Sequence, residues 1–140
     1  MISVTKIFTF ETAHRISNYQ GSCRNVHGHS YKLLVTVAAE SPSADDMVID
    51  FKVLKEMVKR QIIDKLDHTL LLKENPENKF LFKDFPDRIF WMQTEPTAER
   101  MVEWMGEQLK PLLPQHVFLS KISLYETESS LVEMTFPTKT

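Results

Sequence analysis

The sequence predicts an α+β domain in which a four-stranded antiparallel sheet is covered by two helices on one face. Segments at both ends of the chain alternate apolar and polar side chains with the two-residue period of strands. Two central segments repeat apolar residues at three- and four-residue steps, the period of an amphipathic helix. The expected order is therefore β-β-α-α-β-β, within a single domain over residues 1–140.

The first two strands are expected to pair as a hairpin. They cover residues 4–14 and 27–40, with a twelve-residue loop, 15–26, between them. A turn rich in Ser, Asp and Pro follows at 41–46.

Each helix has a capping residue at its expected start. Asp50 precedes a helix over 51–66, and Thr97 opens a second helix that ends before Pro111. Residues 73–95 have a weak, aromatic pattern that predicts a long connection with a short helix around 79–83. Strands are expected at 116–127 and 131–136.

Three of the five histidines are placed to form a metal site. His27 and His29 lie two apart at the start of a strand, so both side chains point to one face of it. His14 ends the preceding strand, and antiparallel pairing brings it beside them. Three imidazoles leave one tetrahedral position open, as in catalytic zinc sites. Cys23, the single cysteine, lies in the connecting loop and is expected to face that position.

A less specific interpretation exists for the same residues. Histidines can be partly buried and hydrogen-bonded to the backbone without binding a metal, and a lone cysteine can act as a small buried hydrophobic residue. The coincidence of His14 at the end of a matching strand with Cys23 in the loop favours the metal site.

Two further positions place ionisable side chains in apolar surroundings. Asp67 and His68 follow the first helix directly, before the apolar run 70–72, and Glu126 ends an apolar strand face. An Asp-His dipeptide at a helix end and a surface glutamate at a strand end are also ordinary features. These positions alone do not decide between a functional site and ordinary residues at the ends of a helix and a strand.

Composition narrows the class of protein. The net charge of −2 gives no reason to expect a nucleic-acid partner, and no stretch approaches the ~20 apolar residues of a membrane helix. A single cysteine cannot form an internal disulfide, which favours the cytoplasm. The chain has only three glycines and neither glycine-rich phosphate-binding motif.

Six short motifs resemble those of the 6-pyruvoyl-tetrahydropterin synthase family, in the family's order and over nearly the whole chain. They are Phe10-Glu11-Thr12-Ala13-His14-Arg15, Cys23-x-x-x-His27-Gly28-His29, Asp50-Phe51, Leu66-Asp67-His68, Pro96-Thr97-Ala98-Glu99 and Tyr125-Glu126-Thr127. The three residues between Cys23 and His27 resemble the branch that forms a 6-carboxytetrahydropterin. The animal pyruvoyl-forming branch has a longer spacer, and a folate-synthesis branch has a glutamate in place of this cysteine. Residues 73–95 depart from the family by being longer and more aromatic.

The resemblance implies the tunnelling fold. In that fold, trimers close their sheets into a barrel, two trimers stack into a hexamer, and active sites lie at subunit interfaces. Asp67 and His68 are therefore expected to serve a zinc ion held by another subunit of a homo-oligomer.

The resemblance also implies a zinc-dependent lyase acting on a small-molecule substrate, 7,8-dihydroneopterin triphosphate. The products would be 6-carboxy-5,6,7,8-tetrahydropterin, acetaldehyde and triphosphate, on the route to queuosine and other 7-deazaguanines. The implied residues are the zinc ligands His14, His27 and His29; the catalytic group Cys23, Asp67, His68 and Glu126; and the substrate contacts Glu126 and Thr97 for the pterin, with Arg15 and Arg24 for the triphosphate.

Two alternatives remain open. A pyruvoyl-forming synthase would keep every residue and release a different product. A non-catalytic zinc-binding assembly protein would keep the fold without turnover.

Overall fold

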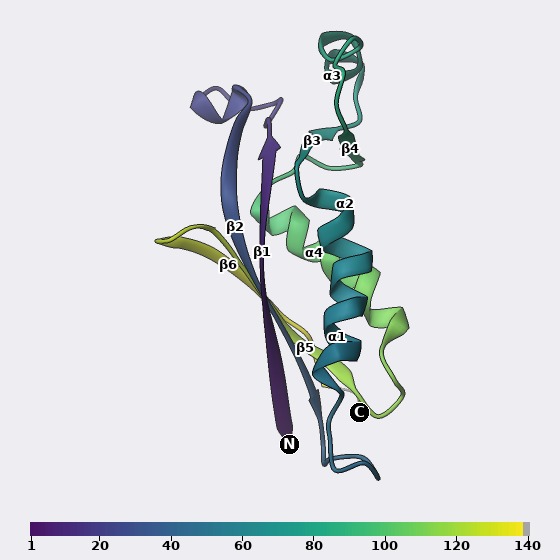
Figure 1. The fold of residues 1–140 in the computed structure, drawn as a ribbon. Helices are drawn as coiled ribbons and strands as arrows, with labels where there is room; N and C mark the ends of the chain where they lie inside the picture. Colours follow the sequence, from purple (N-terminus) through teal and green to yellow (C-terminus); the bar gives the residue numbers. More distant parts are fainter. Residues whose placement is uncertain (139–140) are drawn as a thin grey trace.

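The computed structural model describes residues 1–138. Its longest paired element is the hairpin of β1 (Ile2–His14) and β2 (His27–Ala39), which pair without interruption from Ile2 opposite Ala39 to His14 opposite His27. Alternation along β2 buries Tyr31, Leu33 and Val35 on one face. The predicted hairpin is confirmed, and its two long strands lie side by side (Figure 1).

Within residues 1–138 the sheet has six strands, in the order β4-β3-β1-β2-β5-β6. The outer pair on one side, β5 (Phe118–Thr127) and β6 (Ser130–Thr135), is antiparallel as predicted. On the other side, β3 (Thr69–Lys73) runs parallel to β1, and β4 (Ile89–Met92) runs parallel to β3.

The α+β class is therefore confirmed, whereas the four-stranded, purely antiparallel sheet is wrong. Strand β3 begins three residues after the helix that precedes it, and all of Thr69 to Leu72 is buried. A short strand buried on both sides does not alternate, so periodicity cannot separate it from the end of a helix.

The two long helical segments lie on one face of the sheet (Figure 1). The first is α1 (Phe51–Val58), continued by a π-helical stretch (Lys59–Ile63) and α2 (Asp64–Leu66). The other long one is α4 (Ala98–Leu109). The predicted caps are present, because Asp50 accepts a hydrogen bond from the Lys52 N–H and Thr97 accepts one from the Arg100 N–H.

The π-helical stretch has a packing reason. The fully buried residues of this helix, Leu54, Val58, Ile62 and Leu66, are each four apart. In a helix of 3.6 residues per turn, such a row rotates around the axis by about 40° at each step. The wider turns of a π-helix reduce that rotation and keep the row facing the sheet.

The segment between β3 and α4 contains more structure than a connection. It forms α3 (Pro76–Leu81), capped by Asn75, and then β4. The short helix predicted around 79–83 is present but begins three residues earlier, at Pro76.

The second face of the sheet is open in one chain. On β1 this face carries Ile7, which is 56% exposed.

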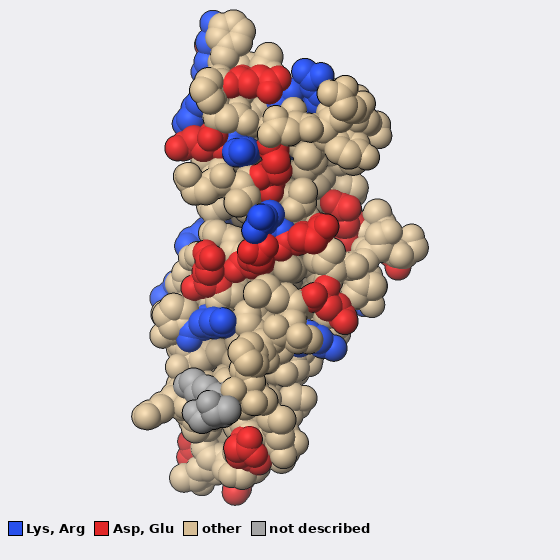
Figure 2. All heavy atoms as spheres, turned by 180° about the vertical axis from the view of Figure 1, so that it is seen from behind, with Lys and Arg blue, Asp and Glu red and all other residues tan. Residues whose placement is uncertain are grey.

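Figure 2 shows acidic and basic side chains interspersed over the side of the molecule that it presents. No helix within residues 1–138 is long and apolar enough to cross a membrane.

Candidate functional site

The β1–β2 pairing brings three imidazoles together at one end of the hairpin. His14 lies directly opposite His27, and His29 lies opposite Thr12 on the same face. One ring nitrogen from each histidine lies within 4.8 Å of those of the other two. The Nε2 atoms of His14 and His27 are only 2.9 Å apart. The convergence predicted from strand alternation is therefore present.

The hydrogen bonds on the far side of two rings define which nitrogen is free. His14 Nδ1 lies 2.8 Å from the Pro96 carbonyl oxygen, and His27 Nδ1 lies 2.8 Å from the Asn25 carbonyl oxygen. A carbonyl only accepts hydrogen bonds, so each Nδ1 is assigned the proton and each Nε2 carries a lone pair. Two lone pairs facing each other at 2.9 Å repel unless a cation or a proton lies between them.

The ring of His29, like the other two, has an inner nitrogen that requires a partner. His29 Nε2 is buried and has no hydrogen-bond partner within residues 1–138. Buried polar atoms without a partner are uncommon and call for an explanation. One cation held by the three Nε2 atoms satisfies all of them, and carbonyl partners on the outer nitrogens are typical of metal-binding histidines. The three residues therefore fit a metal ion.

The protonation of His14 agrees with this role. Burial lowers the pKa of His14, and the neighbouring His27 and His29 rings lower it further. The hydrogen bond to the Pro96 carbonyl and the Glu126 carboxylate act in the opposite direction without reversing the shift. A neutral imidazole, the form that binds metals, is favoured.

Glu126 faces the histidines from the neighbouring strand. Its Oε1 lies 3.6 Å from Nε2 of both His14 and His29, and the buried Tyr31 hydroxyl donates to the same oxygen at 3.4 Å. Glu126 lies where the pairing of β5 with β6 shifts register between Tyr125 and Thr127. Such irregularities commonly re-aim a side chain next to a site. Burial, together with this carboxylate, raises the pKa of Tyr31, which keeps its hydroxyl protonated as a donor.

The three histidines and Glu126 line one cavity of about 300 Å³. Cys23, carried by a short 3₁₀ turn (Ser22–Arg24), is partly buried and lines it, and so does Thr97 at the start of α4. The full lining comprises His14, Ile16, Tyr19, Cys23, His27, His29, Thr97, Ala98, Glu99 and Glu126. The structure thus gathers six of the predicted site residues: the three histidines, Cys23, Thr97 and Glu126.

Two aromatic residues near this cavity were not predicted as site residues. Tyr31 has the same strand parity as His27 and His29, so alternation could have identified it. Tyr19 lies in the irregular loop after β1, where no periodicity places side chains.

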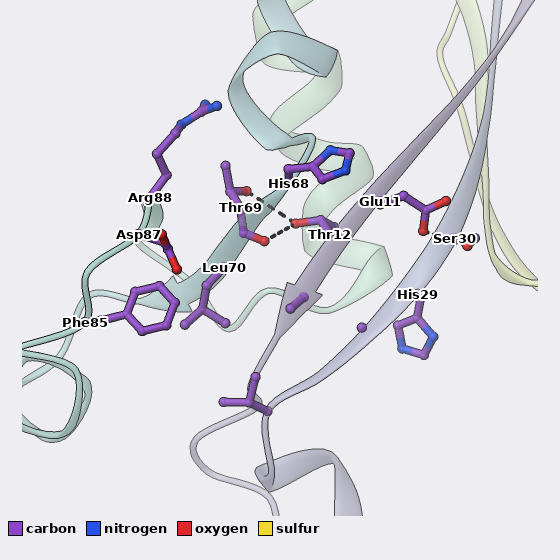
Figure 3. A pocket seen from close by; sticks show the side chains of 13 residues that line it. Glu11, Thr12, His29, Ser30, His68, Thr69, Leu70, Phe85, Asp87 and Arg88 are labelled. Carbon is purple, nitrogen blue, oxygen red and sulfur yellow. Dashed lines mark hydrogen bonds between the residues drawn. The ribbon is translucent and has the colours of Figure 1, made fainter.

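Asp67 and His68 do not line the three-histidine cavity. His68 lines a second cavity of about 580 Å³ together with Glu11, Phe85 and Arg88 (Figure 3). His29 lines both cavities. Its ring Nδ1 lies 3.0 Å from Asp67 Oδ1, which also accepts the Glu11 N–H at 2.8 Å. His68 has a positive φ of 58°, and its side chain is 77% exposed. The Asp–His pair is formed, with the imidazole directed to solvent.

The two arginines predicted to bind triphosphate differ in environment. Arg15 is buried; its Nη1 donates to Asn78 Oδ1 at 2.6 Å and its Nη2 to Glu77 Oε1 at 3.1 Å. Arg24 is about half exposed, with Nη2 3.6 Å from Glu77 Oε1. In this arrangement Arg15 joins the site loop to α3, and Arg24 is accessible.

Residues 3–136 match the family model described as 6-pyruvoyl tetrahydropterin synthase. The chain belongs to this family. Among curated relatives, a protein of Rickettsia felis named 6-carboxy-5,6,7,8-tetrahydropterin synthase is 33% identical over 138 residues, covering 96% of this chain and 100% of the relative.

Solved structures support the fold of this synthase family member. An uncharacterized protein from Wolinella succinogenes has a TM-score of 0.83 at 22% identity, over 96% of this chain and 97% of that one. The 6-pyruvoyl tetrahydropterin synthase of Caenorhabditis elegans has a TM-score of 0.72 at 23% identity, over 97% and 96%. The predicted tunnelling fold is confirmed.

Proposed function

We propose that this protein is a 6-carboxy-5,6,7,8-tetrahydropterin synthase that uses zinc. It would convert 7,8-dihydroneopterin triphosphate and one water molecule to 6-carboxy-5,6,7,8-tetrahydropterin, acetaldehyde and triphosphate. The observation that carries the proposal is the cavity in which Cys23 lies with three histidines that fit a metal ion. The short spacing from Cys23 to His27 and the name of the Rickettsia relative favour the carboxy-forming reaction.

His14, His27 and His29 would hold the zinc ion through Nε2. When bound, zinc supplies positive charge that stabilises negative charge developing on oxygens of the substrate side chain. The carbonyls of Pro96 and Asn25 orient two of the three rings, so the backbone around them is part of the site.

Cys23 is the proposed general base. The reaction requires removal of protons from side-chain carbons that carry hydroxyl groups. A thiolate beside a cation is favoured over the thiol and can accept such a proton. The partial burial of Cys23 in the histidine cavity fits this role.

Glu126 and Thr97 are the proposed pterin contacts. A carboxylate can accept two adjacent N–H donors from the aminopyrimidine edge of a pterin. The Tyr31 hydroxyl, which donates to Oε1, restrains the Glu126 carboxylate toward the cavity. Thr97 also caps α4, so its hydroxyl has two candidate roles.

The Asp67–His68 pair would supply a second acid–base group to the cavity of a neighbouring subunit. Asp67 holds the imidazole through Nδ1, which leaves Nε2 available for proton transfer. This requires a homo-oligomer, which we propose to be the trimer or hexamer typical of the fold. Arg24 is the more accessible of the two proposed triphosphate contacts, because Arg15 would have to leave Glu77 and Asn78.

The place in queuosine synthesis and the cytoplasmic location are further parts of the proposal. They are supported by the proposed product and by the single cysteine, respectively.

The deciding experiment is incubation of the zinc-loaded protein with 7,8-dihydroneopterin triphosphate, followed by assays for acetaldehyde and for carboxypterin. Both products are expected, and Cys23→Ala should lower turnover by at least about 100-fold while its zinc content is unchanged. Triphosphate release with a pyruvoyl product and no acetaldehyde would instead identify the pyruvoyl-forming reaction. Equal behaviour of wild type and Cys23→Ala, with no product from either, would identify a non-catalytic zinc protein.

A further inference from the structure

The loop that carries Cys23 is attached to a distant segment of the chain through Ser17. The Ser17 N–H donates to Glu95 Oε1 at 2.8 Å, and the Ser17 hydroxyl donates to Glu95 Oε2 at 2.5 Å. Asn75 Nδ2 donates to the same hydroxyl oxygen at 3.1 Å. Ser17 itself is 6% exposed. Both oxygens of one carboxylate are thus used on a single loop residue, and hydrogen bonds to charged groups are among the stronger ones in proteins.

The attachment point is close to the thiol through the backbone. The N–H of Ile16, next to Ser17, donates to the Cys23 carbonyl oxygen at 3.0 Å and closes the loop. Ile16 also lines the cavity with Cys23. A displacement of Ser17 is therefore transmitted over one residue to the backbone of Cys23.

The segment after Glu95 contacts the opposite side of the same cavity. The carbonyl of Pro96 accepts the His14 Nδ1 hydrogen bond, and Thr97 lines the cavity while capping α4. Glu95, Pro96 and Thr97 are consecutive in the chain. Glu95 binds the Cys23 loop through Ser17, Pro96 binds His14, and Thr97 caps α4. Because all three share one backbone, the Glu95 carboxylate sets the Cys23 loop relative to His14.

We propose that Glu95 is a positioning residue for Cys23. Its carboxylate holds Ser17 and thereby keeps the thiol beside the three imidazoles; the catalytic consequence rests on the proposed function. Asn75 assists by orienting the Ser17 hydroxyl, and it also caps α3 through its side-chain oxygen. This gives residues 73–95 a role, because they bring Asn75 and Glu95 to the site loop.

The test combines two variants with two measurements. Glu95→Ala removes both bonds to Ser17, and Ser17→Ala removes the hydroxyl bond while keeping the N–H bond. Hydrogen exchange of the peptide covering residues 15–26 is measured on the zinc-loaded protein without substrate, and kcat and KM are measured separately. Glu95→Gln is the conservative variant, because an amide can still accept the Ser17 N–H and donate to its oxygen. Glu103→Ala, which breaks an exposed ion pair with Arg100 on α4, is the matched control.

We expect Glu95→Ala to accelerate exchange in residues 15–26 by about 10-fold or more, and Ser17→Ala to do so by less. In both variants kcat should fall with KM and zinc content near the wild-type values. Glu95→Gln should recover most of both properties, and Glu103→Ala should match the wild type.

Unchanged exchange in Glu95→Ala and Ser17→Ala would overturn the proposal, and so would a rise in KM at constant kcat. If Glu95→Ala does not fold, Ser17→Ala decides in the same way. A wild-type protein without turnover would refute the proposed function, whereas the exchange data would still test the restraint on the loop.

Discussion

At the scale of single residues, the site depends on atoms that do not touch the metal position. The Pro96 and Asn25 carbonyls fix the protons of two imidazoles on their outer nitrogens. The inner nitrogens are then left as lone pairs whose repulsion only a cation or a proton relieves. The metal-free site is therefore less stable electrostatically than a set of ordinary buried histidines.

Replacing one of these histidines should abolish tight metal binding. His27→Ala is expected to weaken zinc binding by at least about 100-fold, more than the loss of a hydrogen-bond partner to a ligand costs. Competition with a chromophoric chelator measures this. His116→Ala is the control, since the His116 ring contacts the Val48 carbonyl away from the site. Equal affinities for the two variants would contradict the three-histidine site.

Stability of the metal-free protein should fall in acid because of His14. Burial lowers its pKa in the folded state below the ordinary 6.5, so between these two pKa values the unfolded chain binds more protons. The free energy of unfolding should therefore decrease as pH falls through about 6.5, until the folded-state pKa is passed. Urea unfolding at several pH values checks this. His14→Gln should show a flatter dependence than the wild type, and a steeper one would show the sign to be wrong.

The sequence predicted the site residues that lie on regular strands. His14, His27 and His29 follow the two-residue alternation, which needs only local pattern. Glu126 was predicted because it ends an apolar strand face, although the pairing of β5 with β6 shifts register there. The partners of Arg15 and Ser17 could not be predicted, because Glu77, Asn78 and Glu95 reach them from about 60 to 80 residues along the chain.

At the scale of elements, the sheet edge formed by β3 and β4 supports the end of β1, where His14 lies. β3 pairs with the last residues of β1, Thr12 to His14. The Thr12 hydroxyl also donates to the Thr69 carbonyl oxygen at 2.8 Å. The end of β1 is therefore held on both sides, by β2 and by β3, at the point where it delivers its histidine.

The strand β3 should contribute strongly to stability. Leu71 is fully buried, and Leu71→Ala is expected to cost about 2–5 kcal/mol of unfolding free energy. Leu81→Ala, at a position 53% exposed on α3, should change it by about 0.5 kcal/mol or less. Denaturant unfolding of both variants checks the difference. Similar small losses would mean that β3 is not part of the core.

Element prediction succeeded where a pattern was long enough. The hairpin and the two main helices show their periods over ten or more residues. The strands of five and four residues at β3 and β4 have no period of their own, and their parallel pairing joins segments far apart in sequence.

At the scale of the whole molecule, one chain leaves groups that a neighbour could use. The sheet exposes Ile7 on its open face, and the Asp67–His68 pair lies outside the three-histidine cavity. A proposed assembly of three or six chains of 16.4 kDa would cover the first and give the second a site to act on.

Mixing two inactive variants tests whether subunits share a site. Cys23→Ala and His68→Ala should each lose activity alone. After unfolding and refolding together in equal amounts, random assembly should restore about one quarter of the wild-type activity, because half of the subunits supply each intact residue. Activity no higher than the sum of the separate variants would place both residues in the same subunit's site.

The uninterrupted pairing of β1 with β2 restricts where this chain can change length. An insertion of one residue in β2 after His29 would turn His27 and His29 to the side now taken by Gly28 and Ser30, and an insertion in β1 before Ala13 would turn His14 in the same way. An insertion in the loop or in the turn after Ala39 leaves that frame intact. Length variants that keep the metal centre should therefore carry their indels in those two connections and spare the hairpin arms.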